Sequence, residues 1–399
     1  MQSLAFQRLW GSSIKYASVH PPATVYHQRL ECDSQTDGIR LATPSPGPPP
    51  DEVHRDGGPP SPPRGRGLIH YSQFTIHNYR THNFLAKHSN LCTLMQMQRK
   101  FTIGLIQMAC TPNPQENLRR AELRVEEAAD QGAEVICLPE LFRSQYFCQH
   151  EDPASFNLAE PVPGPTTQAL GRIAREKQVV VIAPVFERRA AGVYHNSAAI
   201  IDANGEVAGI YRKMHIPDDP AYYEKFYFTP GDLGFRAFDT RVGRIAILIC
   251  WDQWYPEGAR LAALQGASVL FYPSAIGWHP HEKVQHGGAQ RDAWRTIQRG
   301  HAIANGVYVA AVNRVGFEKP ADPQGAGLEF WGTSFVSDPF GVVLKEASTD
   351  QEELVLAEVD LERLEETRRN WPFFRDRRVD AYAGITQRFL DEKTWRKEE

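Results

Sequence analysis

The chain has 399 residues, 42% of them hydrophobic and 23% charged, which is ordinary for a globular protein with a large core. A net charge of −4 offers no electrostatic footprint for binding nucleic acid or an anionic membrane, and no hydrophobic run approaches the roughly 18 residues that cross a membrane. Six cysteines at irregular spacing, none in a Cys-x-x-Cys pair, argue against a disulfide framework or a zinc site and for a reducing, cytoplasmic location.

Residues 1–98 differ in composition from the rest of the chain. Proline and glycine are dense in residues 42–66, seven of the fourteen histidines lie before residue 99, and no stretch keeps a helical or strand periodicity. Such a segment does not bury enough apolar surface to offset its conformational entropy. We therefore expect residues 1–98 to be a disordered or non-native extension, with the working start at Met95 or Met97.

From Phe101 onward the pattern alternates between strands and helices. The first half predicts strands at Phe101–Met108, Glu134–Leu138 and Val179–Pro184, helices at Glu116–Gln131 and Thr166–Lys177, and a hairpin of Tyr194–Ile201 with Glu206–Tyr211. The second half predicts strands at Ile245–Ile249, Ser268–Tyr272, Val307–Asn313, Trp331–Ser337, Gly341–Lys345 and Leu354–Val359, and helices from Tyr255, near Ala289–Ala304 and at Leu361–Arg369. In the helix from Tyr255, Leu261 and Leu264 share one side. The alternation indicates a mixed α/β system of sheets covered by helices, with residues 99–399 in one domain.

Cys250 directly follows the hydrophobic run Ile245–Ile249, at a turn from strand to helix. At such a turn a side chain projects over the sheet edge, and a backbone N–H just after it can face a ligand. Taken alone, a free cysteine is equally well explained as a small buried hydrophobe.

Glu140 and Lys213 also follow predicted strands, and open α/β sheets bind their ligands at the carboxyl ends of strands. Taken singly, Glu140 is also explained as a helix N-terminal carboxylate and Lys213 as a surface charge. As a set with Cys250 they form a hydrolytic site. A carboxylate with a raised pKa in a dry pocket takes the thiol proton, while Lys213 and the Trp251 N–H stabilise an oxyanion.

Three segments resemble the catalytic motifs of the nitrilase, or carbon–nitrogen hydrolase, superfamily: Leu-Pro-Glu-Leu-Phe at 138–142, Tyr-Arg-Lys-Met-His-Ile-Pro-Asp at 211–218 and Ile-Cys-Trp-Asp-Gln-Trp-Tyr-Pro-Glu at 249–257. The resemblance extends from about residue 101 to about residue 374. It implies a four-layer α-β-β-α sandwich and a triad of Glu140, Lys213 and Cys250. It further implies that Glu224, within Tyr-Tyr-Glu-Lys-Phe-Tyr-Phe at 222–228, positions the lysine and the substrate; the alternative is a solvent-facing loop charge.

Within the superfamily the likeness is greatest to the branch that hydrolyses N-carbamoylputrescine to putrescine, carbon dioxide and ammonia, a step in polyamine synthesis from arginine by way of agmatine. It is carried by Leu-Phe-Tyr-Pro-Ser-Ala-Ile-Gly at 270–277 and Arg-Asp-Ala-Trp at 291–294, beside the cysteine motif. This implies a small-molecule carbamoyl amine as substrate. The candidate substrate-binding residues are Tyr146, Trp251, Ser274, Asp292 and Trp294, with Asp219 and Glu282 as further candidates for the distal ammonium. Asp292 is also explained as a helix cap.

The sequence departs from that branch in Gly277–Gly288, which we predict to be a His- and Gly-rich loop. His279, His281 and His286 lie close together in it but lack an accompanying set of carboxylates or cysteines, so we expect no metal and no cofactor. Family members assemble into dimers and larger arrays, so we expect a homo-oligomer. The aromatic tail with Trp371, Phe373 and Phe374 packs either on a partner subunit or on its own domain.

Two other functions are open at this point. A sister amidohydrolase acting on a carbamoyl amino acid, such as 3-ureidopropionate or an N-carbamoyl-D-amino acid, needs a cation for the substrate carboxylate, and Arg291, Arg295 and Arg314 are candidates. A catalytically silent binding or scaffold protein of the same fold is the other. An intact Glu-Lys-Cys-Glu set argues against it, because burying a lysine and two carboxylates costs free energy that a silent copy does not need.

Overall fold

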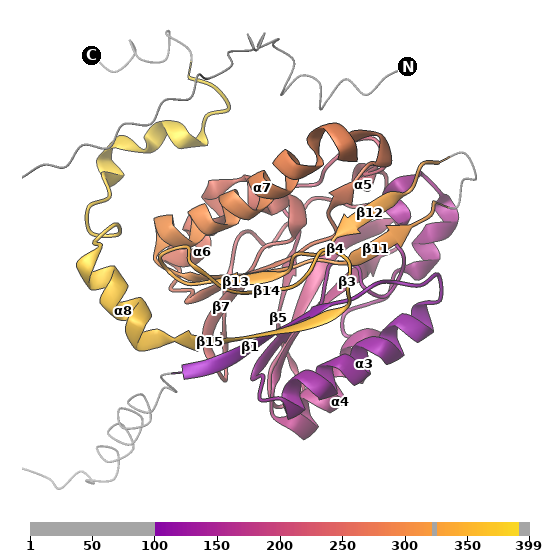
Figure 1. Cartoon of the computed structure of the whole chain (residues 1–399), viewed down its shortest axis with the longest axis horizontal. Coiled ribbons are helices and arrows are strands. Elements are labelled where there is room, and N and C mark those ends of the chain that lie inside the picture. Colours follow the sequence, from indigo (N-terminus) through magenta and orange to yellow (C-terminus); the bar gives the residue numbers. More distant parts are fainter. Residues whose placement is uncertain (1–99, 321–324, 391–399) are drawn as a thin grey trace, which may run out of the picture. The chain divides into compact units, whose positions relative to one another are not determined.

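The computed structural model describes residues 100–320 and 325–390 (Figure 1). The prediction for residues 1–98 lies outside the described residues. Within the described part of the chain, none of the helices combines the length and hydrophobicity that a membrane crossing demands.

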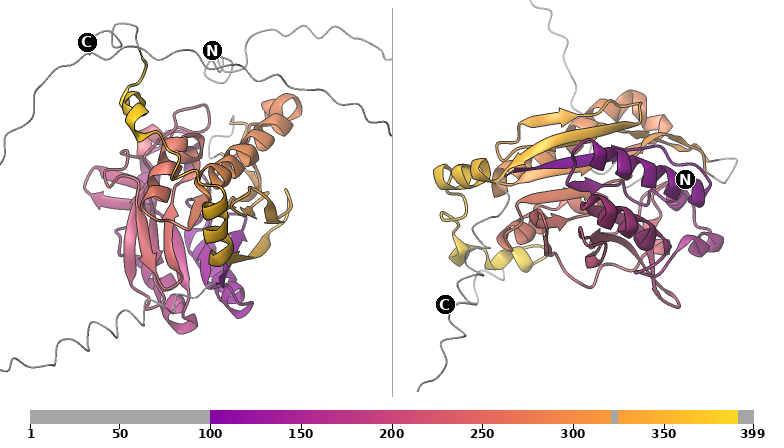
Figure 2. Two further views of the ribbon diagram at one scale, coloured as in Figure 1. Left: turned by 90° about the vertical axis from the view of Figure 1, so that its left-hand side faces the viewer. Right: turned by 90° about the horizontal axis from the view of Figure 1, so that it is seen from below.

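Six strands form the first sheet, in the order β15-β1-β2-β3-β4-β5. Strands β1, β2 and β3 run parallel to one another and the other neighbours pair antiparallel. Their bounds are β1 (Lys100–Gln107), β2 (Val135–Cys137), β3 (Val180–Ala190), β4 (Val193–Ile201), β5 (Val207–Arg212) and β15 (Glu353–Asp360). Figure 2 shows β15 lying beside β1, so the two ends of the domain's sequence share one sheet edge.

The second sheet also has six strands, in the order β14-β13-β10-β8-β7-β6. Its central strands β7, β8 and β10 are parallel and almost fully apolar, as expected for strands covered on both faces. The bounds are β6 (Ala237–Thr240), β7 (Gly243–Ile247), β8 (Val269–Pro273), β10 (Tyr308–Val312), β13 (Phe335–Ser337) and β14 (Val343–Glu346).

Helices cover the outer face of each sheet, and the inner faces pack on one another. Helices α3 (Pro114–Asp130) and α4 (Pro165–Lys177) pack on the first sheet, while α6 (Pro256–Leu264) and α7 (Pro280–Asn305) pack on the second (Figure 1). The central core joins side chains of both sheets, such as Leu105, Ile182, Ile247 and Phe271. The predicted α-β-β-α sandwich is confirmed.

Smaller elements lie at the end of the sandwich where the catalytic motifs meet. A three-stranded sheet has the order β11-β12-β9, with β9 at Gly277–Trp278, β11 at Val315–Glu318 and β12 at Leu328–Trp331. Near it are the short helix α5 (Glu224–Tyr227) and a mainly aromatic cluster that includes Tyr146, Phe147 and Phe330. Further 3₁₀ turns occupy Phe147–Gln149, Pro153–Leu158, Cys250–Trp254, Val379–Ala381 and Ala383–Thr386.

The predicted loop Gly277–Gly288 is wrong. Its first two residues form β9, and α7 already begins at Pro280, nine residues before the predicted start. Proline at the first helical position has the φ that a helix needs, and its missing N–H would be unpaired there anyway. Gly287 packs closely on a tryptophan, because a Cβ there would lie 3.0 Å from Trp278 Nε1. Composition therefore misled the prediction for this segment.

The predicted strand Trp331–Ser337 is two strands that belong to different sheets. Strand β12 ends at Trp331 and β13 begins at Phe335. Between them Gly332 and Thr333 both adopt left-handed φ angles of +53° and +59°, which turn the chain out of one sheet and into the other.

The side of α6 that carries Leu261 and Leu264 faces outward, and both leucines are about half exposed. The face that packs on the sheet consists of Gly258, Ala259, Ala262 and Ala263, small residues that allow the helix to approach closely. The C-terminal helix α8 (Leu361–Asn370) follows β15, and Asp360 caps it by accepting from the N–H groups of Glu362 and Arg363.

Candidate active site

Cys250 lies at a sharp turn after β7. Its backbone has a φ of +44°, a conformation that costs a non-glycine residue about 1–3 kcal/mol and that clusters at functional sites. The chain continues in the 3₁₀ turn Cys250–Trp254 and then in α6. The residue is 4% exposed, so the thiol is buried rather than on the surface. The predicted strand-to-helix setting of Cys250 is therefore present.

Glu140 follows β2 and is completely buried. Its Oε1 accepts hydrogen bonds from Asn196 Nδ2 at 2.7 Å and from Lys213 Nζ at 2.9 Å. Its Oε2 is also buried and has no hydrogen-bond partner among the described residues. Burying a carboxylate oxygen without a hydrogen bond costs free energy, so such an atom indicates a functional role. Here one oxygen of Glu140 is fixed and the other is free to accept a proton.

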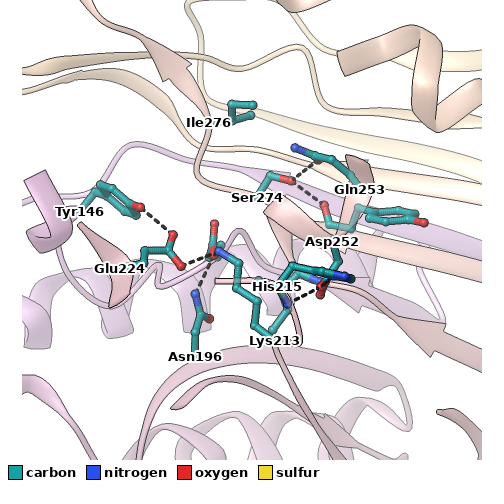
Figure 3. A network of polar contacts seen from close by, with 12 residues as sticks. Tyr146, Asn196, Lys213, His215, Glu224, Asp252, Gln253, Ser274 and Ile276 are labelled. Atoms are coloured by element: carbon teal, nitrogen blue, oxygen red, sulfur yellow. Dashed lines mark hydrogen bonds and ion pairs between the residues drawn. The ribbon is translucent and has the colours of Figure 1, made fainter. Parts of the chain in front are cut away.

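Lys213 follows β5, and its ammonium lies between two carboxylates. Its Nζ donates to Glu224 Oε2 at 2.6 Å as well as to Glu140, and all three side chains are buried (Figure 3). Burial opposes the charge of Lys213, but the negative charges of Glu140 and Glu224 outweigh it and raise the lysine pKa well above its usual value. The lysine is therefore a fixed positive charge.

Glu224 opens the short helix α5 and is 1% exposed, which excludes the solvent-facing alternative. Its Oε1 accepts a hydrogen bond of 2.6 Å from the Tyr146 hydroxyl (Figure 3). Burial raises the pKa of Glu224 to about 7, against the opposing effect of the Lys213 charge. Tyr146, a predicted substrate-binding residue, thus contacts the second glutamate directly.

The Cys250 thiol interacts electrostatically with Glu140, Lys213 and Glu224. Burial raises its pKa well above the usual value, and the negative charge of Glu140 acts in the same direction, while Lys213 and a backbone hydrogen bond with Ala275 act against them. The raised pKa favours the neutral thiol, which needs a base to become a nucleophile. The free Oε2 of Glu140 has the chemistry of that base.

Two further predicted residues lie around the nucleophile. Trp251, half-buried, packs edge-on against Trp254 with 6.4 Å between ring centroids. Ser274 is buried after β8, and its hydroxyl lies 3.3 Å from Gln253 Oε1 and 3.2 Å from the Tyr272 carbonyl (Figure 3). Ser274 therefore belongs to the network beneath the cysteine turn.

The structure does not bring Asp292 and Trp294 to the triad. Asp292 is exposed in the middle of α7, and the N-cap of this helix is His279, so the capping explanation for Asp292 is wrong. Trp294 is fully buried, donates from Nε1 to Gln253 Oε1 at 2.8 Å and packs edge-on against Phe335. It is part of the core between α7 and the second sheet.

Sequence reasoning missed two residues that hold the site together. Asn196, in the middle of β4, binds Glu140 through its side chain, while its carbonyl accepts from the Lys213 N–H at 2.8 Å. Asp252 lies two residues after the nucleophile and is completely buried. No local pattern marks Asn196, because its partners are 56 and 17 residues away. Asp252 lies in a quoted motif, but its partners become visible only in three dimensions.

Arg314, considered above for a substrate carboxylate, is fully engaged within the protein. Its Nη1 pairs with Glu318 at 2.7 Å, and its Nη2 donates to the carbonyls of Glu140 and Leu141 at 2.9 and 2.7 Å. Glu318 in turn accepts from the Tyr146 N–H at 2.5 Å. This buried ion pair therefore holds the segment that carries Glu140 and Tyr146.

A buried thiol beside a carboxylate with one free oxygen and a fixed ammonium, on an α-β-β-α sandwich, defines a cysteine-dependent hydrolase of carbon–nitrogen bonds. Residues 102–369 match the family model described as carbon-nitrogen hydrolase. The chain belongs to the carbon–nitrogen hydrolase family, as the resemblance to the nitrilase superfamily predicted.

Several known proteins are similar over most of the chain. The N-carbamoylputrescine amidase of Solanum lycopersicum is 43% identical over 294 residues, which cover 73% of this chain and 97% of that protein. The citrullinase of Francisella tularensis is 38% identical over 288 residues, 72% of this chain and 98% of that protein. The crystal structure of a carbon-nitrogen hydrolase from Helicobacter pylori G27 superposes with a TM-score of 0.70 at 47% identity, covering 73% of this chain and all of that one.

Proposed function

We propose that the protein is an N-carbamoylputrescine amidase, which hydrolyses N-carbamoylputrescine to putrescine, carbon dioxide and ammonia in polyamine synthesis. The observation that carries the chemistry is the unpartnered Oε2 of Glu140, on a carboxylate that interacts electrostatically with the Cys250 thiol and is paired with the Lys213 ammonium. The choice of substrate is supported by relatives of this name, which are 43–44% identical over nearly their whole length.

In the proposed mechanism Glu140 Oε2 takes the Cys250 proton, and the sulfur forms a bond to the ureido carbon. Lys213 and the Trp251 N–H stabilise the oxyanion of the tetrahedral intermediate. The C–N bond then breaks and an amine departs with the proton that Glu140 holds. Water, deprotonated by Glu140, attacks the remaining thiol ester, and the C–S bond breaks. The Cys250 sulfur takes the proton back from Glu140, and the carbamate product loses carbon dioxide.

The substrate's distal ammonium needs an anionic partner, and Asp219 is the candidate that the structure favours. Asp219 is half-buried, and its buried Oδ1 has no hydrogen-bond partner within the part of the chain that the structure describes. Burial raises its pKa to about 6, and the negative charges of Glu282 and Asp218 act in the same direction. Tyr222 lies within electrostatic range of both Asp219 and Cys250. A bound cation would relieve this repulsion.

A carbamoyl amino acid is the second candidate substrate, and the similarity to a citrullinase favours it. Of the three arginines considered for its carboxylate, Arg314 is engaged with Glu318 and Arg295 is paired with Glu346 at 2.6 Å. Arg291 lies over the Trp278 ring, 5.9 Å from its centroid. Arg291 is therefore the arginine that we would assign to the substrate carboxylate in this alternative.

The test is ammonia release from N-carbamoylputrescine, citrulline, 3-ureidopropionate and an N-carbamoyl-D-amino acid, for the wild type and Cys250→Ala. A preference for the carbamoyl diamine, lost in the variant, supports both the substrate and the nucleophile. A preference for a substrate with a carboxylate retains the triad but overturns the proposed substrate. Absence of turnover with all four overturns the proposal.

We also propose that the enzyme is a homo-oligomer in the cytoplasm. Beyond α8 the chain exposes many large apolar side chains, namely Trp371, Phe373, Val379, Tyr382, Ile385, Phe389 and Leu390. Phe374 by contrast packs on its own domain, between Arg260 and Arg368. The four described cysteines have free thiols, as in reducing compartments. Light scattering on the full chain and on a chain ending at Asn370 tests the oligomer: loss of assembly supports it, and a monomeric full chain contradicts it.

A further inference from the structure

Asp252 accepts four hydrogen bonds on one buried carboxylate. Its Oδ2 accepts from the Tyr211 hydroxyl at 2.7 Å and from the Ile249 N–H at 2.9 Å. Its Oδ1 accepts from the His215 N–H at 3.0 Å and from His215 Nδ1 at 2.7 Å (Figure 3). The residue is 0% exposed, so neither oxygen faces the solvent.

The donors flank two groups of the proposed mechanism. Tyr211 and His215 lie two residues before and two residues after Lys213, and Ile249 is the residue directly before Cys250. The two segments come from different sheets, since Tyr211 lies near the end of β5 and Ile249 follows β7. A single carboxylate therefore links the Tyr211 side chain before the lysine and the His215 backbone after it to the backbone beside the nucleophile.

The same contacts hold the turn at Cys250 in its left-handed conformation. The Asp252 N–H donates to the Ile249 carbonyl at 3.0 Å while the Asp252 side chain accepts from the Ile249 N–H, so the turn is closed in both directions. The His215 ring is held as well, because it stacks on Tyr255 with centroids 3.7 Å apart and an interplanar angle of 4°. Surroundings that fix a strained residue in several ways are what such a conformation needs.

We propose that Asp252 is a positioning residue that sets the place of the Lys213 ammonium relative to the Cys250 sulfur, without contact with the substrate. The oxyanion forms at the carbon that the sulfur attacks, and the Lys213 ammonium stabilises it only at about 2.7–3.1 Å from the place where the charge develops. Displacements of about 1 Å from such geometry lower rates by roughly 100-fold. The proposal depends on the hydrolase chemistry and not on which carbamoyl compound is the substrate.

The decisive variant is Asp252→Asn, which keeps the shape of the side chain but replaces one accepting oxygen with an NH2 group. That group would face the N–H and O–H donors that now bind the oxygen. We expect kcat to fall by about 100-fold, the loss that a displacement of about 1 Å causes, with KM within about threefold. Asp338→Asn is the matched control. Asp338 is equally buried, and its hydrogen-bond partners are the N–H groups of Phe340 and Val342 and the Arg363 side chain, none of which belongs to the triad or to the Asp252 network. Its kcat should remain that of the wild type.

Rates are expressed per active site, titrated by the amount of thiol ester formed in a single turnover. A residue with a merely structural role would lower the fraction of active enzyme but not the rate per active site. Tyr211→Phe removes one donor without changing charge and covers the case in which Asp252→Asn fails to fold. We expect kcat per site to fall by about 10-fold, the loss of one hydrogen bond to a charged group at the low end of its range.

Unchanged kcat per site in Asp252→Asn, or in Tyr211→Phe where the first variant does not fold, overturns the proposal. An equal fall in Asp338→Asn also overturns it. The substrate is whichever carbamoyl compound the wild type hydrolyses fastest, so a failure of the proposed substrate is seen in the wild type and is distinguishable from a failure of the positioning role.

Discussion

The amide of Asn196 donates to the same carboxylate oxygen of Glu140 that the Lys213 ammonium binds, and leaves the other oxygen free. Two donors on Oε1 prevent the carboxylate from rotating, so Oε2 keeps its direction. The division of one carboxylate into a fixed oxygen and a reactive oxygen is the feature from which the base function follows.

Asn196→Ala should lower kcat by about 10- to 150-fold, because a hydrogen bond to a charged group contributes about 1.5–3 kcal/mol. Its effect on KM should be small, because Asn196 is fully buried and contacts Glu140 and the Lys213 backbone, not a residue proposed to bind the substrate. Steady-state kinetics check this. The control is Asn305→Ala, which removes another buried amide, one that donates to the His301 carbonyl. An equal fall in kcat in both variants would show that the loss is one of general stability.

The pH dependence should reflect Glu224, because burial raises its pKa to about 7. Below that pH Glu224 takes up a proton and Lys213 loses one of its two charged partners, so kcat/KM should decline toward acid through about pH 7. In the folded protein the pKa of Glu224 lies above its ordinary value of 4.5, so ionisation of Glu224 opposes folding. The wild type should therefore lose stability relative to Glu224→Gln as the pH rises from 4.5 to about 7. Denaturant unfolding of both proteins at pH 5 and pH 8 tests the sign.

Asp219→Asn should raise KM for N-carbamoylputrescine by about 10-fold or more, the effect of losing one charge-assisted contact with a ligand. The matched substrate is butylurea, which has the same carbon chain and ureido group but no ammonium. Its KM should be nearly unchanged by the substitution. Equal changes for both compounds would exclude Asp219 as the partner of the distal ammonium.

Glu318→Gln should destabilise the protein by about 3–5 kcal/mol, because it leaves the buried Arg314 guanidinium without its charged partner. Glu365→Gln is the control, since Glu365 pairs with Arg369 at the same i,i+4 spacing but on an exposed helix face, where such pairs contribute about 0.3–0.5 kcal/mol. Chemical denaturation measures both. A similar small change in the two variants would contradict the structural importance of the buried pair.

Adjacent glycines in α7 should respond differently to alanine. At Gly288 nothing lies within 4 Å of a Cβ, so Gly288→Ala should stabilise the helix by about 0.8–1.0 kcal/mol. At Gly287 a Cβ would meet the Trp278 ring at 3.0 Å, and the Gly287 carbonyl also accepts from Trp278 Nε1. Gly287→Ala should therefore be less stable than Gly288→Ala. Thermal unfolding compares the pair, and equal midpoints would refute the packing role of Gly287.

The sequence by itself determined the alternation of strands and helices and the class of chemistry. Apolar periodicity is a local property, so the strands that precede Glu140, Lys213 and Cys250 were predicted nearly at their true ends. The motifs around these residues identified the family. Where local composition and packing disagreed, prediction failed, as in the glycine-rich start of α7 and at Gly332–Thr333, where left-handed residues divide one apolar run between two sheets.

Only the tertiary structure decided how the triad is held and which residues have no place in it. The residues that hold the triad bind partners that are distant in sequence, and some of these partners are backbone groups, as for Asn196, Asp252 and Arg314. Neither hydrophobic periodicity nor a sequence motif predicts such pairs. For the same reason Trp294, which shares a motif with exposed Asp292, packs in the core instead. Burial and hydrogen-bond direction depend on what the fold places opposite a side chain, and that is fixed only when the two sheets pack together.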